Sequence, residues 1–187
     1  RSQKASVVDV RATKAGVPQQ SAIALSVVSH SENVPRSLYE YLAQQENYEQ
    51  FARFLAGAFA LENLLYFARV IMFRNALLSA LNVDQDEWRP SGTLWNDVFS
   101  LRFEYLGSVN LNENQNDVDE AIRANATEIY NQFICHHAVQ QVNISWEDRE
   151  NLHSFFAANR KHECSDYLVV FNDSVLEVYQ LLLTIYQ

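Results

Sequence analysis

Glycine and proline are scarce in this chain, and their scarcity limits the folds that it can adopt. The 187 residues include four glycines and three prolines, and long stretches contain neither. An all-β fold needs many tight turns, in which these two residues are the usual punctuation. The sequence therefore favours helices.

Apolar residues recur at intervals of three and four along much of the chain, as on the buried face of a helix. Such a stripe is expected within residues 48–59, 118–134 and 171–185. Residues 61–81 are apolar on most sides, which predicts a helix buried in the core. We predict about eight helices in one bundle, an all-α fold without internal repeats.

Three polar segments are predicted to begin helices. Ser37 stands three residues before Glu40, which is the spacing of a capping box. Ser145 precedes an acidic first turn that includes Asp148, where negative charge is favoured by the helix dipole. The side chains of residues 172–174 are expected to cap the last helix.

Residues 1–19 mix small, polar and basic residues without helical periodicity, and we predict a flexible tail or linker there. Residues 20–187 are predicted to form one helical domain that begins with a short helix around residues 23–28. Acids and asparagines become frequent from residue 82 to about residue 116, and within that stretch the apolar residues from Leu94 to Leu106 predict a further helix.

A net charge of −9 argues against binding to nucleic acid or to an anionic membrane surface, because both would repel most of this protein. We see no apolar run of transmembrane length and no basic-then-apolar leader, so direct membrane insertion is not expected. Cys135 and Cys164 are expected to be free thiols of a cytosolic protein.

Motifs for catalysis are missing from the sequence. There is no glycine-rich phosphate loop, nucleophile elbow, H-E-x-x-H or C-x-x-C. His136, His137 and His162, with the two cysteines, match no zinc spacing. We therefore expect no metal, no cofactor and no catalytic residue.

Three N-x-S/T sequons, at Asn125, Asn143 and Asn172, leave open a different class of protein. If they are glycosylated, the chain is a secreted helical protein. An unchanged gel mobility after deglycosylation would exclude that interpretation.

Several short blocks, taken in order, resemble the family of regulators of G-protein signalling, the RGS domains. The blocks are SLYEYL at 37–42, FARFL at 51–55, FALENLLYF at 59–67, IYNQFI at 129–134, VN at 142–143 and FNDSVLEVYQLLL at 171–183. Together they account for most of residues 37–187. The resemblance implies an all-helical, two-lobed domain.

The resemblance also implies a function. Such a domain binds the switch regions of a G-protein α subunit (Gα) in its GTP or transition-state form and accelerates GTP hydrolysis. It supplies no catalytic residue, since Gα holds its own arginine and the glutamine that orients water. It acts in the cytoplasm, at the inner face of the plasma membrane.

Particular residues of this chain match the family's Gα-contacting positions. Glu62 and Asn63 match contacts to the switches, and Asn143 matches an asparagine that reaches in beside the catalytic glutamine, where a carboxamide can donate and accept hydrogen bonds. The complete set that we expect at the interface is Phe59, Ala60, Glu62, Asn63, Gln141, Asn143, Ser145, Leu181, Ile185 and Tyr186.

The chain also departs from the family pattern. Ala60 replaces a serine, Ser145 replaces an acid, and Ile185 and Tyr186 replace an acid-serine pair. These departures support an alternative, a docking or scaffold module that binds a signalling partner without accelerating hydrolysis. Residues from about 80 to 116 have no family counterpart, and we expect a helical insertion that is a structural extension by default or a surface for a further protein partner.

Overall fold

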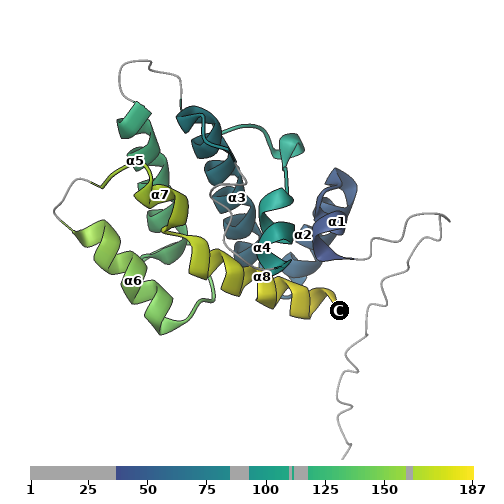
Figure 1. The fold of residues 1–187 in the computed structure, drawn as a ribbon. Coiled ribbons are helices and arrows are strands. Elements are labelled where there is room, and N and C mark those ends of the chain that lie inside the picture. The colour runs from purple at the N-terminus through teal and green to yellow at the C-terminus, as the bar shows by residue number, and fades with distance from the viewer. Residues whose placement is uncertain (1–36, 85–92, 110, 112–117, 159–161) are drawn as a thin grey trace, which may run out of the picture. The chain divides into compact units, whose positions relative to one another are not determined.

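The computed structural model describes residues 37–84, 93–109, 111, 118–158 and 162–187. The tail predicted at 1–19, the helix predicted at 23–28 and the segment around Trp88 lie outside these residues. Within the described residues the regular structure is helical and no strand occurs, which confirms the all-α prediction (Figure 1). The elements are α1 (Leu38–Leu42), α2 (Gln45–Gly57), α3 (Leu61–Leu81), α4 (Thr93–Ser100), η1 (Glu104–Leu106), α5 (Val118–Ile129), η2 (Tyr130–Ile134), α6 (Trp146–Ala157), α7 (Asp166–Val169) and α8 (Asn172–Tyr186).

Helix α3 is the core helix that its composition predicts, and it contacts α2, α5 and α8. The ring of Phe67 stacks on that of Tyr179 in α8, with 5.4 Å between the centroids. The hydroxyl of Tyr66 forms a buried hydrogen bond of 2.6 Å with the hydroxyl of Ser174, also in α8. Because α3 is covered on several sides, it is apolar around most of its circumference.

Two helical stretches, Leu61–Leu81 and Asp166–Tyr186, are long and apolar enough to cross a membrane by length and composition. The expectation that no apolar run reaches this length is therefore wrong. Helix α3 is this apolar because it is a buried core helix, and 56% of its most apolar window lies inside the protein. A core helix and a membrane helix satisfy the same compositional test.

Two of the three predicted helix starts are confirmed. The Ser37 hydroxyl accepts a hydrogen bond from the Glu40 amide at 3.4 Å, and the Ser145 hydroxyl accepts one from the Asp148 amide at 3.2 Å. The prediction for α8 is wrong, because no side chain caps its first turn. Ser174 is buried instead, and its hydroxyl lies 3.0 Å from the Phe171 carbonyl oxygen, to which it donates.

The apolar stripe of α2 is shorter than predicted. Tyr48, Phe51 and Leu55 are buried, whereas Phe54 is 42% exposed. The helix ends at Gly57, and the chain then turns toward α3, so that Phe59 leaves the core.

The segment that we interpret as an insertion packs on the bundle. Its predicted helix ends at Ser100 rather than continuing to Leu106, and residues 101–103, which have no regular structure, lead into η1. The ring of Phe103 lies against the rings of Tyr48 at 5.7 Å and Phe67 at 6.2 Å, between centroids. These buried aromatic contacts favour the structural extension over a partner-binding face.

Polar contacts also attach this segment to α1 and α3. The Asn75 amide in α3 donates to the Leu101 carbonyl at 3.1 Å, and the Tyr105 hydroxyl donates to the Leu42 carbonyl in α1. The Arg74 guanidinium lies 3.7 Å from the centre of the Phe99 ring in α4, a cation–π contact.

Candidate functional site

One buried carboxamide links two of the segments that the sequence nominates. Asn63 lies in the first turn of α3, as predicted, and is 2% exposed. Its Oδ1 accepts a hydrogen bond of 3.1 Å from the backbone amide of Asn143, a residue 80 positions later. Its Nδ2 donates to the Ala60 carbonyl and to the Glu62 carboxylate, both at 3.4 Å. Asn63 therefore joins the turn before α3 to the loop before α6.

Two further side chains hold the loop that contains Asn143. Arg149 in α6 donates from Nη1 to the Ile134 carbonyl at 2.5 Å and from Nη2 to the Val142 carbonyl at 2.8 Å. Glu177 in α8 accepts the Ser145 amide at 2.9 Å. The loop is thus fixed from α3, α6 and α8 through its backbone.

The fixed loop presents its polar side chains outward. Asn143 is exposed. Its bond with Asn63 uses the Asn143 backbone amide and does not involve the Asn143 carboxamide. Gln141 is exposed as well, and its amide donates to the Cys135 carbonyl at 3.5 Å. Ser145 is the N-cap of α6, and its hydroxyl is occupied by the Asp148 amide. The Asn143 carboxamide is therefore accessible to a partner that approaches this loop.

Phe59 is the most unusual residue of the turn before α3. Its φ of 55° lies in the left-handed region, which is costly for a residue with a bulky side chain. Its side chain is nevertheless 92% exposed, so core packing does not compensate the strain. The next residue, Ala60, is the N-cap of α3, and its side chain makes no capping hydrogen bond. Strained exposed residues of this kind occur at binding and active sites.

The strain at Phe59 gives a testable consequence for stability. Asparagine tolerates the left-handed region better than phenylalanine, so Phe59→Asn should leave the free energy of unfolding unchanged or raise it by up to about 1 kcal/mol. Urea denaturation measures this. The same change at exposed Ala58, whose φ is −95°, is the control and should bring no gain. Destabilisation at Phe59 by more than about 1 kcal/mol would mean that its ring packs against the protein.

Acidic groups surround the base of the loop. Partial burial of Asp148 raises the pKa of its carboxyl group to about 6, the neighbouring carboxyl groups of Glu177 and Asp173 add to this effect, and the Ser145 hydroxyl opposes it. Glu62 is half-buried beside Asn63. This part of the surface is therefore complementary to a partner that carries basic groups.

The last three expected interface residues lie farther along α8. The ring of Tyr186 lies 5.1 Å from that of Tyr41 in α1 and 6.2 Å from that of Phe51 in α2, between centroids. Ile185 packs against the core, and Leu181 is half-buried. Tyr186 follows Glu177 by nine residues, which corresponds to about 13 Å along the helix axis. The structure thus groups Ile185 and Tyr186 with the first two helices and not with the Asn63–Asn143 pair.

Several residues of the site were missed at the level of sequence. Trp146 is 69% exposed in the first turn of α6, and Val139 is 96% exposed in the preceding loop, so large apolar side chains flank Asn143 on both sides in the chain. A tryptophan in an otherwise polar helix start was a usable signal for Trp146. Arg149 and Glu177 gave no such signal, because their role depends on carbonyls and amides brought together by the fold.

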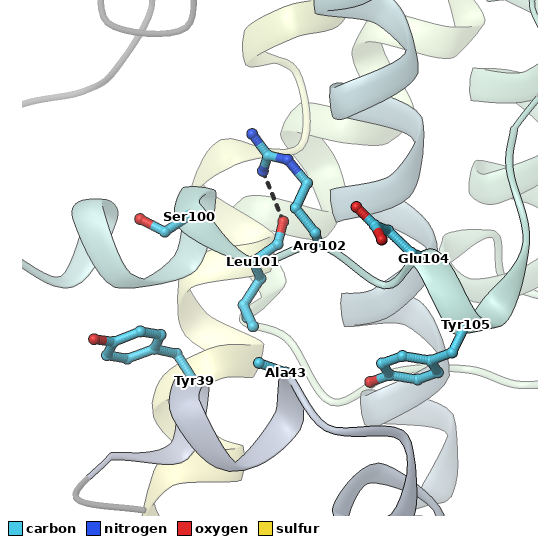
Figure 2. A pocket seen from close by; sticks show the side chains of 7 residues that line it. All are labelled: Tyr39, Ala43, Ser100, Leu101, Arg102, Glu104 and Tyr105. Carbon is cyan, nitrogen blue, oxygen red and sulfur yellow. Dashed lines mark hydrogen bonds between the residues drawn. The ribbon is translucent and has the colours of Figure 1, made fainter.

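The candidate site lies on the surface, where Phe59, Asn143 and Ser145 are exposed. One opening in the described part of the chain lies between α1 and the segment after α4, lined by Tyr39, Arg102 and Tyr105 among others, and contains none of the site residues (Figure 2). There the Arg102 guanidinium donates to the Leu101 carbonyl at 2.8 Å, so it also serves to hold its own turn.

Within the described ranges, no three His, Cys, Asp or Glu side chains are grouped so that they could hold a metal ion. Cys135 and Cys164 are thiols outside any disulfide, and they donate hydrogen bonds to the Asn131 carbonyl at 3.2 Å and to the Asp119 carboxylate at 3.0 Å. No model of a protein family matches the chain, and a search of curated proteins finds no match either.

Proposed function

We propose that this chain is a GTPase activator of the RGS type, which binds a Gα subunit and stabilises its switch regions in the transition state of GTP hydrolysis. The observation that carries the proposal is the hydrogen bond from the Asn143 amide to the Asn63 side chain. The resemblance nominates these two residues from separate blocks, and the bond joins them, with Asn63 buried and the Asn143 carboxamide exposed.

The proposed mechanism needs no catalytic group from this chain. A Gα subunit already holds the arginine and the glutamine that act on GTP and water. A surface that binds the transition-state arrangement of the switches better than the ground state lowers the barrier by the difference in binding free energy. A fixed loop suits this role, because it is already ordered before binding. Only the partner's switches then lose mobility when the complex forms.

Each residue of the surface has a distinct part in this proposal. Asn143 reaches the catalytic glutamine of the partner, and Glu62 contacts the switches. Asn63 is too buried for a direct contact and acts as a positioning residue through the Asn143 loop. Phe59 and Trp146 supply exposed aromatic area, which is frequent at the energetic centres of protein interfaces.

Replacing Asn143 by alanine tests the proposed contact. If the carboxamide pairs with the glutamine of Gα in the transition state, its loss should cost about 1–3 kcal/mol, or roughly 5- to 150-fold in the accelerated rate. Single-turnover GTP hydrolysis measures that rate. Stability should not change, because the Asn63 bond uses the backbone of residue 143. Asn151→Ala, at an exposed position of α6, is the matched control. A full rate in Asn143→Ala would reject the role.

A second candidate function is a docking module of the same fold that does not accelerate hydrolysis. It is favoured by the position of Ile185 and Tyr186, which pack toward α1 and α2 and so leave the proposed surface without its C-terminal part. Affinity for Gα bound to GDP and aluminium fluoride, measured beside single-turnover hydrolysis, separates the two. Binding with acceleration supports the activator, and binding without acceleration supports the docking module.

A further inference from the structure

Two histidine side chains come together where the loop that contains Asn143 begins. His136 lies just after η2, at the start of that loop, and His153 lies in the second half of α6. Their ring centres are 5.6 Å apart, with 55° between the ring planes, and both side chains are exposed. The pair matches no metal-binding spacing in the sequence, because its members come from different elements that the fold brings together.

The π-helical turn η2 sets the position of this pair. The Cys135 amide donates to the Tyr130 carbonyl at 3.0 Å, which holds the residue before His136 at the end of η2. The Tyr130 hydroxyl forms a hydrogen bond of 2.7 Å with Nδ1 of His153. The Tyr130 ring also stacks on that of Phe156 in α6, with 4.5 Å between the centroids. Wide helical turns of this kind are frequent at functional sites.

The hydrogen bond with Tyr130 leaves Nε2, the other ring nitrogen of His153, for a ligand. A histidine that binds a metal ion usually donates its second ring N–H to an oxygen acceptor, which fixes the tautomer and the orientation of the ring. The Tyr130 hydroxyl can be that acceptor, because partial burial raises the pKa of the phenol and keeps it neutral. His153 is therefore already held as a metal ligand would be.

The distance between the two rings suits one shared ion. Two imidazoles that bind one ion at about 2.1 Å have their ring centres roughly 4.5–5.6 Å apart at coordination angles of about 90–120°. The observed 5.6 Å is at the upper end of this range, and rotation of the exposed His136 ring can direct a nitrogen to the ion. Neutral imidazole is a ligand of zinc, copper and nickel ions, whereas calcium and magnesium prefer oxygen.

We propose that His136 and His153 bind a divalent transition-metal ion of the zinc or copper type, with Tyr130 as the positioning residue that orients His153. Water completes the coordination, because within the described ranges no third His, Cys, Asp or Glu forms a metal-binding group with the pair. The ion ties the start of the Asn143 loop to α6, in addition to the two bonds from Arg149. Cu²⁺ binds more tightly than Zn²⁺ or Ni²⁺, as for other nitrogen ligands.

Calorimetric titration of the whole chain with Cu²⁺ and with Zn²⁺ tests the site. His136→Ala and His153→Ala should each weaken binding by about tenfold or more, because one of the two protein ligands is lost. Tyr130→Phe keeps the stacked ring and should weaken binding about tenfold, as is usual when the partner of a metal-bound histidine is removed. His137→Ala is the matched control, since it removes the neighbouring exposed histidine and should bind as the wild type does.

Nuclear magnetic resonance locates the ion. On addition of Zn²⁺, the ring signals of His136 and His153 should shift together, and the nitrogen spectrum of His153 should show a protonated Nδ1. An affinity unchanged in either alanine variant would overturn the proposal, and so would an equal loss in His137→Ala or a shift of only one of the two rings. A full affinity in Tyr130→Phe would reject its positioning role. All of these measurements use the chain without a Gα subunit, so they are independent of the proposed function.

Discussion

Replacing Phe103 by alanine should lower the free energy of unfolding by about 3–5 kcal/mol. Phe103 belongs to the segment without a family counterpart, yet it is buried among the rings of Tyr48, Phe67 and Tyr105. Truncation would remove the apolar ring from the core and leave a cavity between α2 and α3. Urea denaturation measures the loss.

The control for Phe103 comes from the same segment. Leu106 is 40% exposed, so Leu106→Ala should change stability by no more than about 0.5 kcal/mol. If Phe103→Ala were as stable as the control variant, the segment would be an appendage and not part of the core. A loss of stability much larger than that of the control would mean that the segment is part of the core. Deleting the whole segment would then unfold the domain, so a deletion variant could not be used to test for a partner.

Asn63→Ala is the change that we expect to affect both stability and activity. It leaves the Asn143 amide without its buried partner, at a cost of about 1–3 kcal/mol in the free energy of unfolding. If the loop must be fixed for Gα activation, the single-turnover rate should also decrease roughly 5- to 150-fold under conditions in which the variant is fully folded.

A double-mutant cycle with Asn143→Ala distinguishes positioning from a general structural role. If Asn63 acts through Asn143, the two rate effects are not additive, because the second change removes an interaction that the first has already disturbed. Additive losses would show that Asn63 affects the partner by another route. Asn143→Ala alone should keep the wild-type stability and lower only the rate. The free energy of unfolding and the single-turnover rate can therefore be separated.

Helix positions could be predicted from the sequence where local chemistry decides them. Ser37 and Ser145 cap helices because a hydroxyl at that place satisfies a free amide whatever surrounds it. The same reasoning was wrong at Ser174, where burial beside Tyr66 gave the hydroxyl a different partner. Tertiary contacts override local preference there, and a single sequence does not reveal them.

Most residues of the candidate site could be nominated from the sequence, but their arrangement in space could not be predicted. Residues 59–63 and 141–145 were chosen by their resemblance to family blocks, and nothing in their spacing indicates that Asn63 is buried or that it binds a backbone amide. Phe59 was expected in a core stripe as well as at the interface, and only the left-handed turn after α2 shows that it points to solvent. Ile185 and Tyr186 could not be separated from the other residues until the length of α8 was known.

The bond between Asn63 and Asn143 also has a consequence for attempts to imitate the surface. Its two ends are 80 residues apart, and the chain between them includes α4 and α5. Closing so long a loop costs entropy that the bond alone cannot recover, so the bond forms only when the intervening helices have packed. A synthetic peptide that copies residues 59–67 or 135–146 should therefore compete poorly with the whole domain, and an inhibitor that imitates this surface would have to present both segments on one scaffold.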